Sequence, residues 1–262
     1  MLRQDSKSHL DTLYGINAVK EALGSRPVDY VLVAEGPRGP RVEEIIRLAR
    51  QTTVPVRFAP AAALERAAGT SRHQNVVAAC AAKQYDDLET LLQVSAAPLL
   101  VVLDSVEDPA NLGAVARTAV AAGADGMVVP ERRAARLTAA AARSSAGALE
   151  HLKVARVSNL TRTLNEIKEK NLWVFGFQAE AAKCYLDLDY RSPCALVFGG
   201  EGHGLHRLVR ETCDDLASIP LYGRVESLNV SVAAGVVLYE AARQRHEPRV
   251  NEAGGSSAEA SE

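Results

Sequence analysis

The feature that most constrains the fold is a series of short apolar runs in the second half of the chain, with helix-length segments between them. The runs occupy residues 99–103, 126–129, 172–176, 195–198 and 217–219. They lack the polar alternation of a half-exposed strand, so each is typical of a strand covered on both faces, as in a parallel sheet. Residues 99–245 are therefore predicted to form an α/β domain with helices on both faces of a parallel sheet, ending in a helix over 229–245.

The front of the chain predicts a second, smaller α/β domain over residues 11–83. Strands are expected at 30–34, 54–58 and 76–81, with helices at 42–50 and near 61–68. Residues 84–98 are typical of a linker with one short helix that ends at a proline. Flexible ends are expected at 1–10 and 246–262, since the latter is polar and rich in glycine.

The composition limits the class of protein. A chain of 262 residues with 47% apolar and 24% charged residues can bury a sizeable core. Neither a membrane-spanning run of about 18 apolar residues nor a secretory signal is found, which predicts a cytoplasmic protein with no membrane partner. The four cysteines have no C-x-x-C spacing and no neighbouring histidine in a ligand pattern, which predicts buried free thiols and no metal site.

Charge is distributed unevenly around a net value of -2. Residues 1–83 carry twelve Lys and Arg against eight Asp and Glu, whereas residues 246–262 carry one against four. A basic front and an acidic tail fit an RNA partner, although an excess of this size is also common on ordinary protein surfaces.

Three segments with unusual polar residues follow predicted strands, where an open α/β sheet binds its ligands. In the first, residues 104–119, Asp108 or Asn111 is a candidate helix N-cap. Capping does not explain Arg117, which lies among alanines and valines and needs an anionic partner.

The second segment, residues 197–205, has four glycines, at 199, 200, 202 and 204, which permit a tight turn close to a ligand. Their spacing does not match G-x-G-x-x-G, so the dinucleotide-binding fingerprint is absent. Glu201 in this loop could bind a cation, accept a hydroxyl proton or simply be a solvated turn residue. In the third segment, residues 219–235, Ser227 or Asn229 is a candidate N-cap, and a helix N-terminus is a suitable place for an anion or polar ligand.

In this order and spacing, the three segments closely resemble the motifs of the SpoU (TrmH) family of RNA ribose 2'-O-methyltransferases in the SPOUT superfamily. The resemblance continues through residues 143–151, 154–157 and 239–245. Residues 13–19 and 73–78 resemble the amino-terminal substrate-binding domain of two-domain members, whose fold is similar to ribosomal proteins that bind kinked RNA.

The resemblance implies a catalytic domain with a carboxy-terminal trefoil knot after Gly199, and a homodimer formed through that region. It implies transfer of a methyl group from S-adenosylmethionine, which leaves as S-adenosylhomocysteine, to a ribose in ribosomal RNA. The front domain favours a guanosine of 23S rRNA as the target. A tRNA ribose methyltransferase and a non-catalytic rRNA-binding assembly factor remain alternatives.

The resemblance also implies roles for particular residues. The catalytic set is Asn111, Arg117, Glu201, Ser227 and Asn229, in which Asn111 orients the ribose hydroxyl or braces the arginine. We expect Arg117 to clamp an RNA phosphate rather than act as the base, because a guanidinium keeps its proton; Glu201 is the alternative proton acceptor. The cofactor contacts are expected at Gly199, Ile219 and Leu228, with Gly176 and Phe177 as a further wall. Phosphate contacts are expected from one helical segment with Arg132, Arg133, Arg136 and Arg143, or this segment is simply a solvated helix face.

Overall fold

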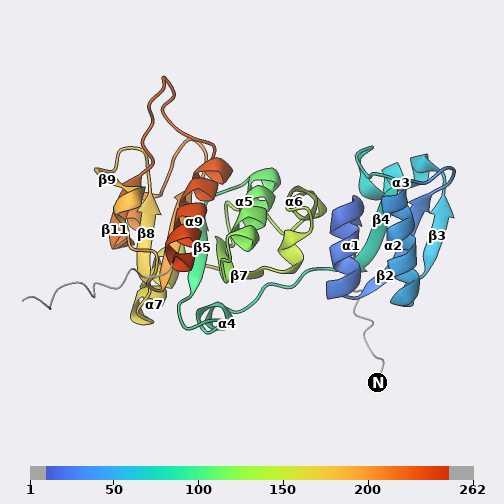
Figure 1. Cartoon of the computed structure of the whole chain (residues 1–262), viewed down its shortest axis with the longest axis horizontal. Helices are drawn as coiled ribbons and strands as arrows, with labels where there is room; N and C mark the ends of the chain where they lie inside the picture. The colour runs from blue at the N-terminus through green and yellow to red at the C-terminus, as the bar shows by residue number, and fades with distance from the viewer. Residues whose placement is uncertain (1–9, 248–262) are drawn as a thin grey trace, which may run out of the picture.

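The computed structural model describes residues 10–247, and it contains two β-sheets that lie in separate parts of the chain (Figure 1). The first sheet has four strands in the order β1-β4-β2-β3, in which β4 is antiparallel to both β1 and β2 and β3 is parallel to β2. The elements of this part are β1 (Leu10–Tyr14), α1 (Ile16–Ser25), β2 (Val28–Ala34), α2 (Pro40–Gln51), β3 (Val56–Ala59), α3 (Ala61–Ala68) and β4 (Val76–Ala81).

Alternation of side chains along the strands divides this part into two layers of core. Val31 and Val33 of β2 point to the face covered by α1 and α2, where Ile45 is fully buried. Ala34 and Val77 point to the opposite face, which Leu64 of α3 covers. Helices therefore cover both faces of the small sheet.

The second sheet has seven strands in the order β7-β6-β5-β10-β8-β11-β9, and every neighbouring pair is parallel. Its strands are β5 (Leu99–Asp104), β6 (Gly126–Pro130), β7 (Lys153–Val157), β8 (Trp173–Phe177), β9 (Lys183–Cys184), β10 (Cys194–Gly199) and β11 (Asp215–Ser218). Its helices are α4 (Leu88–Leu92), α5 (Pro109–Ala121), α6 (Ala139–Ser144), α7 (Leu160–Glu169), α8 (Arg207–Thr212) and α9 (Val230–His246), with short 3-10 turns η1 (Ala148–Glu150) and η2 (Tyr185–Asp187).

Helices lie on both faces of this sheet, which confirms the expected α/β fold with a parallel sheet. Residues of α5 and α9 share one apolar cluster with alternate residues of β5 and β10, and residues of α4, α7 and α8 share a second cluster with the intervening residues of the same strands. The central strand β5 is buried at every position, which agrees with the unbroken apolar run in its sequence. Figure 1 shows α5 and α9 side by side on one face.

Some elements differ from the expectation. The segment after β6 is a loop up to the N-cap Thr138, so α6 contains Arg143 but not Arg132, Arg133 or Arg136. Strand β1 and helix α1 were not expected as elements, because β1 is mixed in polarity and the N-cap of α1 is Gly15, which has no side chain to cap the helix. Of the thiols, Cys80 and Cys194 are buried as predicted, whereas Cys184 and Cys213 are only half-buried. Residues 1–9 and 248–262, where the flexible ends were expected, lie outside the described residues.

The two parts of the chain meet where α1 packs against residues 142–151. Arg26 Nη2 donates to Glu150 Oε1 at 2.9 Å, and Ser25 Oγ donates to Glu150 Oε2 at 3.1 Å. The side chains of Arg26 and Glu150 are only 10% and 3% exposed. Ala142 of α6 packs into the apolar core of the first part. The contact is therefore built from a buried ion pair beside an apolar patch.

Candidate active site

The three polar segments lie together at the carboxyl edge of the large sheet. β5 and β10 are neighbours, and β8 lies between β10 and β11, so the loops that follow these strands meet at one edge. Asp108 caps α5 by accepting from the backbone N–H of Ala110 at 2.9 Å, with Pro109 in the first turn. Asn229 caps α9 by accepting from the backbone N–H of Ser231 at 2.9 Å. Each cap places a helix start beside the strand ends.

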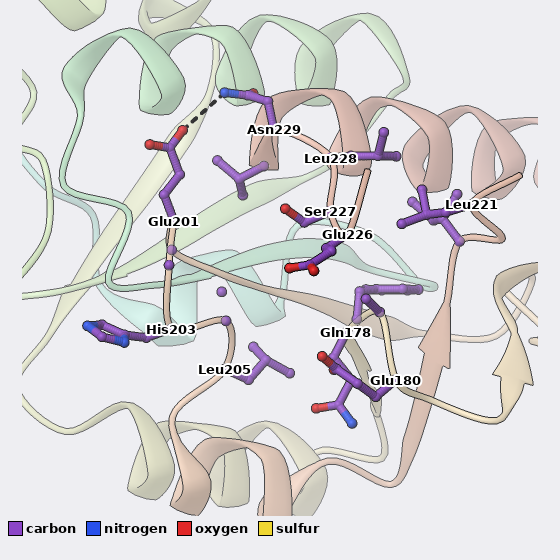
Figure 2. A pocket seen from close by; sticks show the side chains of 18 of the residues that line it. Gln178, Glu180, Glu201, His203, Leu205, Leu221, Glu226, Ser227, Leu228 and Asn229 are labelled. Carbon is purple, nitrogen blue, oxygen red and sulfur yellow. Dashed lines mark hydrogen bonds between the residues drawn. The ribbon is translucent and has the colours of Figure 1, made fainter. Parts of the chain in front are cut away.

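Asn111, Glu201 and Asn229 form one hydrogen-bond network at this edge. Asn111 Nδ2 donates to Glu201 Oε1 at 2.7 Å. Asn229 Nδ2 lies 3.1 Å from both Glu201 Oε1 and Asn111 Oδ1. Figure 2 shows Asn229 pointing toward Glu201 across the pocket rim. Residues 90 and 118 positions apart in the sequence are thus brought together, and they come from all three segments.

The network fixes one oxygen of a carboxylate by two amide donors. Glu201 Oε2 takes no hydrogen bond from any side chain or backbone group within residues 10–247, so it can accept a hydrogen bond or a proton from a bound hydroxyl. Asn229 Oδ1 accepts from Ser231 Oγ at 2.6 Å, which fixes the orientation of the amide. The arrangement is suited to orienting a hydroxyl group next to a proton acceptor.

A pocket of about 660 Å³ opens beside this network. Besides Glu201 and Asn229, five residues expected to be catalytic or to bind the cofactor line it: Phe177, Gly199, Ile219, Ser227 and Leu228. Figure 2 shows Ser227 and Leu228 on the side of the pocket formed by the entry to α9. A Cβ at Gly199 would lie 2.0 Å from the carbonyl carbon of Gly204, so only glycine allows the two backbones to approach this closely.

Gly176 lies behind the pocket wall rather than among the residues that line it. It is the last residue but one of β8, where an added Cβ would meet Cys213 Sγ and Leu216 at 2.8 Å. Burial raises the pKa of the Cys213 thiol to about 12, so this sulfur is uncharged near neutral pH.

Within residues 10–247, none of the arginines expected to contact RNA lines the pocket or shares a hydrogen bond with the Asn111, Glu201 and Asn229 network. Arg117 is exposed on α5, the helix that contains Asn111. Arg132, Arg133 and Arg136 are exposed in the loop before α6. The guanidinium of Arg143 lies 5.9 Å from the ring centre of Tyr14, so this arginine stands where the two parts of the chain meet.

Several charged residues that line the pocket were missed in the sequence. Glu180 follows β8, Glu226 precedes Ser227, and Arg210 belongs to α8. Figure 2 shows Glu180 and Glu226 on the wall opposite Glu201. Glu226 lies within the third segment and could have been named from its position, whereas nothing local marks Glu180 or Arg210.

Residues 10–247 offer no cluster of metal ligands: no group of three or more His, Cys, Asp or Glu side chains in this range is placed to hold a metal ion. No helix among these residues is both long and apolar enough to cross a membrane.

Comparison with known proteins gives one consistent result. The model of the SpoU rRNA Methylase family matches residues 98–239, and the model for RNA 2'-O ribose methyltransferase substrate binding matches residues 12–86. The putative TrmH family tRNA/rRNA methyltransferase YacO of Bacillus subtilis (strain 168) is 44% identical over 92% of this chain and 98% of its own length. The 23S rRNA (guanosine-2'-O-)-methyltransferase RlmB of Photobacterium profundum is 42% identical over 90% of this chain and 98% of its own length.

A solved structure agrees with these relatives. The SpoU methyltransferase AviRb from Streptomyces viridochromogenes, in complex with the cofactor AdoMet, superimposes with a TM-score of 0.78 at 27% identity, over 93% of this chain and 95% of its own. Since a family model covers more than half of the chain and the relatives cover nearly all of it, this protein belongs to the SpoU family of RNA methyltransferases.

Proposed function

We propose that this protein transfers a methyl group from S-adenosylmethionine to the ribose 2'-hydroxyl of a guanosine in 23S ribosomal RNA. The observation that carries the proposal is the network of Asn111, Glu201 and Asn229 at the rim of the 660 Å³ pocket. The choice of 23S rRNA rests on the relative named as a 23S rRNA guanosine methyltransferase, which is 42% identical.

The pocket fits the donor in size and in the chemistry of its walls. Its volume of about 660 Å³ is within the range usual for small-molecule sites. Ile219 and Leu228 offer apolar walls for an adenine ring. Gly199 has no side chain to cover its main-chain groups, so these groups can hydrogen-bond to a ligand in the pocket. The carboxylates of Glu180 and Glu226 favour a cationic ligand. When bound, S-adenosylmethionine supplies an electrophilic methyl group and departs as S-adenosylhomocysteine.

The residues of the network would prepare the acceptor hydroxyl. Asn111 and Asn229 hold Glu201 in place, and the second oxygen of Glu201 accepts the hydroxyl proton as the oxygen is methylated. Ser227, on the same rim, adds a polar contact to the ribose. Holding the hydroxyl in line with the donor is itself a large part of the rate enhancement.

Arg117 would bind an RNA phosphate. Its guanidinium is exposed on α5, and a phosphate matches the bidentate geometry of this group. Further phosphate contacts would come from Arg132, Arg133, Arg136 and Arg143. Arg143 contacts Tyr14, which belongs to the part of the chain matched by the substrate-binding model, residues 12–86. We propose that residues 11–83 form this RNA-binding domain, 84–98 the linker and 99–245 the catalytic domain.

We also propose a homodimer formed through a trefoil-knotted carboxy-terminal region. Four large apolar side chains in the stretch from the end of β11 into α9 are well exposed: Tyr222, Val225, Val232 and Tyr239 are 96%, 62%, 52% and 58% accessible. Val232 and Tyr239 are two turns apart in α9 and therefore lie on one face of the helix, an arrangement that is usual at a protein interface. Sedimentation velocity of the wild-type protein tests the dimer.

The activity is tested with labelled S-adenosylmethionine and unmodified 23S rRNA, 16S rRNA and tRNA, followed by nucleoside analysis for 2'-O-methylguanosine. We expect label in 23S rRNA, and its loss in Asn111→Ala and Arg117→Ala variants that keep their far-ultraviolet circular dichroism. Label in tRNA alone would make the protein a tRNA methyltransferase. Cofactor binding without label in any RNA would indicate a non-catalytic RNA-binding factor.

A further inference from the structure

The glycine-rich loop that carries Glu201 leaves β10 at Gly199 and turns back on itself within a few residues. Gly200 and Gly204 form an isolated bridge, with the N–H of Gly204 donating to the carbonyl of Gly200 at 3.2 Å. Gly202 and Gly204 have φ values of 85° and 60°, which glycine adopts without strain. The loop is closed on itself, so its position depends on how its two ends are attached.

Both ends of the loop are attached to one residue, Asp104, at the end of β5. At the entry, the N–H of Gly200 donates to the main-chain carbonyl of Asp104 at 2.7 Å. At the exit, the N–H of His206 donates to Asp104 Oδ2 at 2.7 Å, and His206 Nδ1 lies 3.0 Å from Asp104 Oδ1. Because a carboxylate only accepts hydrogen bonds, Nδ1 carries the proton in this contact.

The entry is rigid for steric reasons, whereas the exit depends on side chains. A Cβ at Gly200 would lie 2.1 Å from the carbonyl oxygen of Ser105, so the chain passes the end of β5 at a distance that only glycine permits. Asp104 is only 4% exposed, and a buried carboxylate of this kind requires donors. His206 supplies two of them, from its backbone and its ring.

We infer that Asp104 and His206 are positioning residues, which together fix the exit of the 199–206 loop and so hold Glu201 in contact with Asn111 and Asn229. Neither lines the pocket, so they act through the loop rather than on a ligand. The catalytic consequence rests on the proposed function, but the restraint on the loop does not.

The test compares His206→Ala, His206→Asn and Arg207→Ala. Alanine removes the ring donor, asparagine restores a donor near the position of Nδ1, and Arg207 is the neighbouring residue, which is exposed and paired with Glu211 on its own helix. We expect kcat to fall about tenfold or more in His206→Ala, since a displacement of about 1 Å can cost that much. His206→Asn should recover most of it, and Arg207→Ala should match the wild type.

Hydrogen–deuterium exchange provides a readout that does not need catalysis. Amides of residues 200–206 should exchange faster in His206→Ala, while those of β5 and β10 and the thermal midpoint stay close to wild type. A double-mutant cycle with Asp104→Asn should be strongly non-additive in kcat, because the two side chains share one contact.

Unchanged exchange in the loop, or a kcat for His206→Ala within twofold of wild type, overturns the inference. So does His206→Asn behaving like His206→Ala in a folded protein. If His206→Ala does not fold, His206→Gln takes its place, since its longer amide misses the Nδ1 position. A wild-type protein without methylation on any RNA would refute the proposed function instead, and the exchange experiment would still decide whether Asp104 and His206 hold the loop.

Discussion

Glu201 is the residue on which the proposed chemistry converges, because its Oε1 accepts from both Asn111 and Asn229. Glu201→Gln keeps the size and one acceptor oxygen but removes the ability to take a proton. We expect kcat to fall about 100-fold or more, as for loss of a general base, with cofactor affinity nearly unchanged. Steady-state kinetics and calorimetric titration with S-adenosylhomocysteine measure the two quantities.

The same variant tests whether Glu201 accepts the hydroxyl proton. Near wild-type turnover in Glu201→Gln would show that the carboxylate does not accept the proton. The role of the network would then be to orient the hydroxyl.

Buried thiols predict a loss of stability at alkaline pH. Burial raises the pKa of the Cys80 thiol from 9.0 to about 11. In the unfolded chain this thiol ionises near its usual pKa, whereas in the folded chain it stays neutral. The free energy of unfolding is therefore unaffected below about pH 9 and decreases as the pH rises toward 11.

Urea unfolding of the wild type and of Cys80→Ala between about pH 7.5 and 10.5 measures this contribution. The wild type should lose stability more steeply over the upper part of this range than the variant, whatever their difference at neutral pH. Parallel curves would mean that Cys80 does not titrate on unfolding.

At the scale of elements, α5 and α6 approach each other closely because residue 113 is glycine. A Cβ on Gly113 would lie 2.4 Å from the carbonyl oxygen of Ala141 and 2.6 Å from Ser144 Cβ. Gly113→Ala should therefore destabilise the protein by about 1–3 kcal/mol through overpacking, despite the better helix propensity of alanine. The midpoint of chemical unfolding measures the effect.

Gly235 in α9 is the matched control. A Cβ there would meet only Thr118 Cγ2, at 3.7 Å, which is an ordinary contact. Gly235→Ala should then be neutral or stabilising by up to about 1 kcal/mol, as for a glycine inside a helix. Equal destabilisation by both substitutions would show that propensity or backbone strain, and not the α5 to α6 contact, controls the outcome.

The elements show what a sequence pattern can and cannot predict. Strands such as β5 were predictable because burial on both faces leaves an unbroken apolar run. The start of α6 was not, since the four arginines between residues 132 and 143 resemble a polar helix face, while the helix begins only after the Thr138 cap. Strand β1 lacked a pattern of its own, because its pairing with β4 depends on residues far along the chain.

The candidate site likewise contains residues that the sequence predicted and residues that it did not. Asn111, Glu201 and Asn229 were named from loops at strand ends, and the sheet order brings those loops together. Glu180 and Arg210 were missed because only the three-dimensional path of the chain places them on the pocket wall. The hydrogen bonds between Asp104 and His206 were missed for the same reason, because the two residues are 102 positions apart.

At the scale of the whole molecule, the pair Arg26 and Glu150 holds the front part of the chain against the large sheet. Arg26 also donates to the carbonyl of Ala81 at 2.8 Å, and its Nε is buried without a hydrogen-bond partner within residues 10–247. Glu150→Gln should cost about 1–3 kcal/mol, because it removes the nearer carboxylate of a buried guanidinium and leaves only Asp11, whose Oδ2 lies 3.9 Å from Arg26 Nη1. It should also raise KM for rRNA while leaving cofactor affinity unchanged.

Unfolding measurements, small-angle X-ray scattering and methylation kinetics test this prediction together. Replacing both partners, Arg26→Met with Glu150→Met, should recover much of the stability, since the only charge left without its partner is then Asp11, whose side chain is 34% exposed to water. Glu166→Gln, which removes the exposed partner of Arg162, is the control and should change little. A Glu150→Gln protein with wild-type stability and scattering would show that the apolar contact at Ala142 suffices.

Helix α9 is the last element of the described residues. Its N-cap, Asn229, belongs to the candidate site, and the helix packs on α5, which lies near the middle of the sequence. During synthesis, the pocket wall formed by residues 226–230 therefore cannot join the loops at Asn111 and Glu201 until α9 has left the ribosome. A product terminated before α9 would lack the pocket wall formed by residues 226–230 and the contact of Asn229 with Glu201.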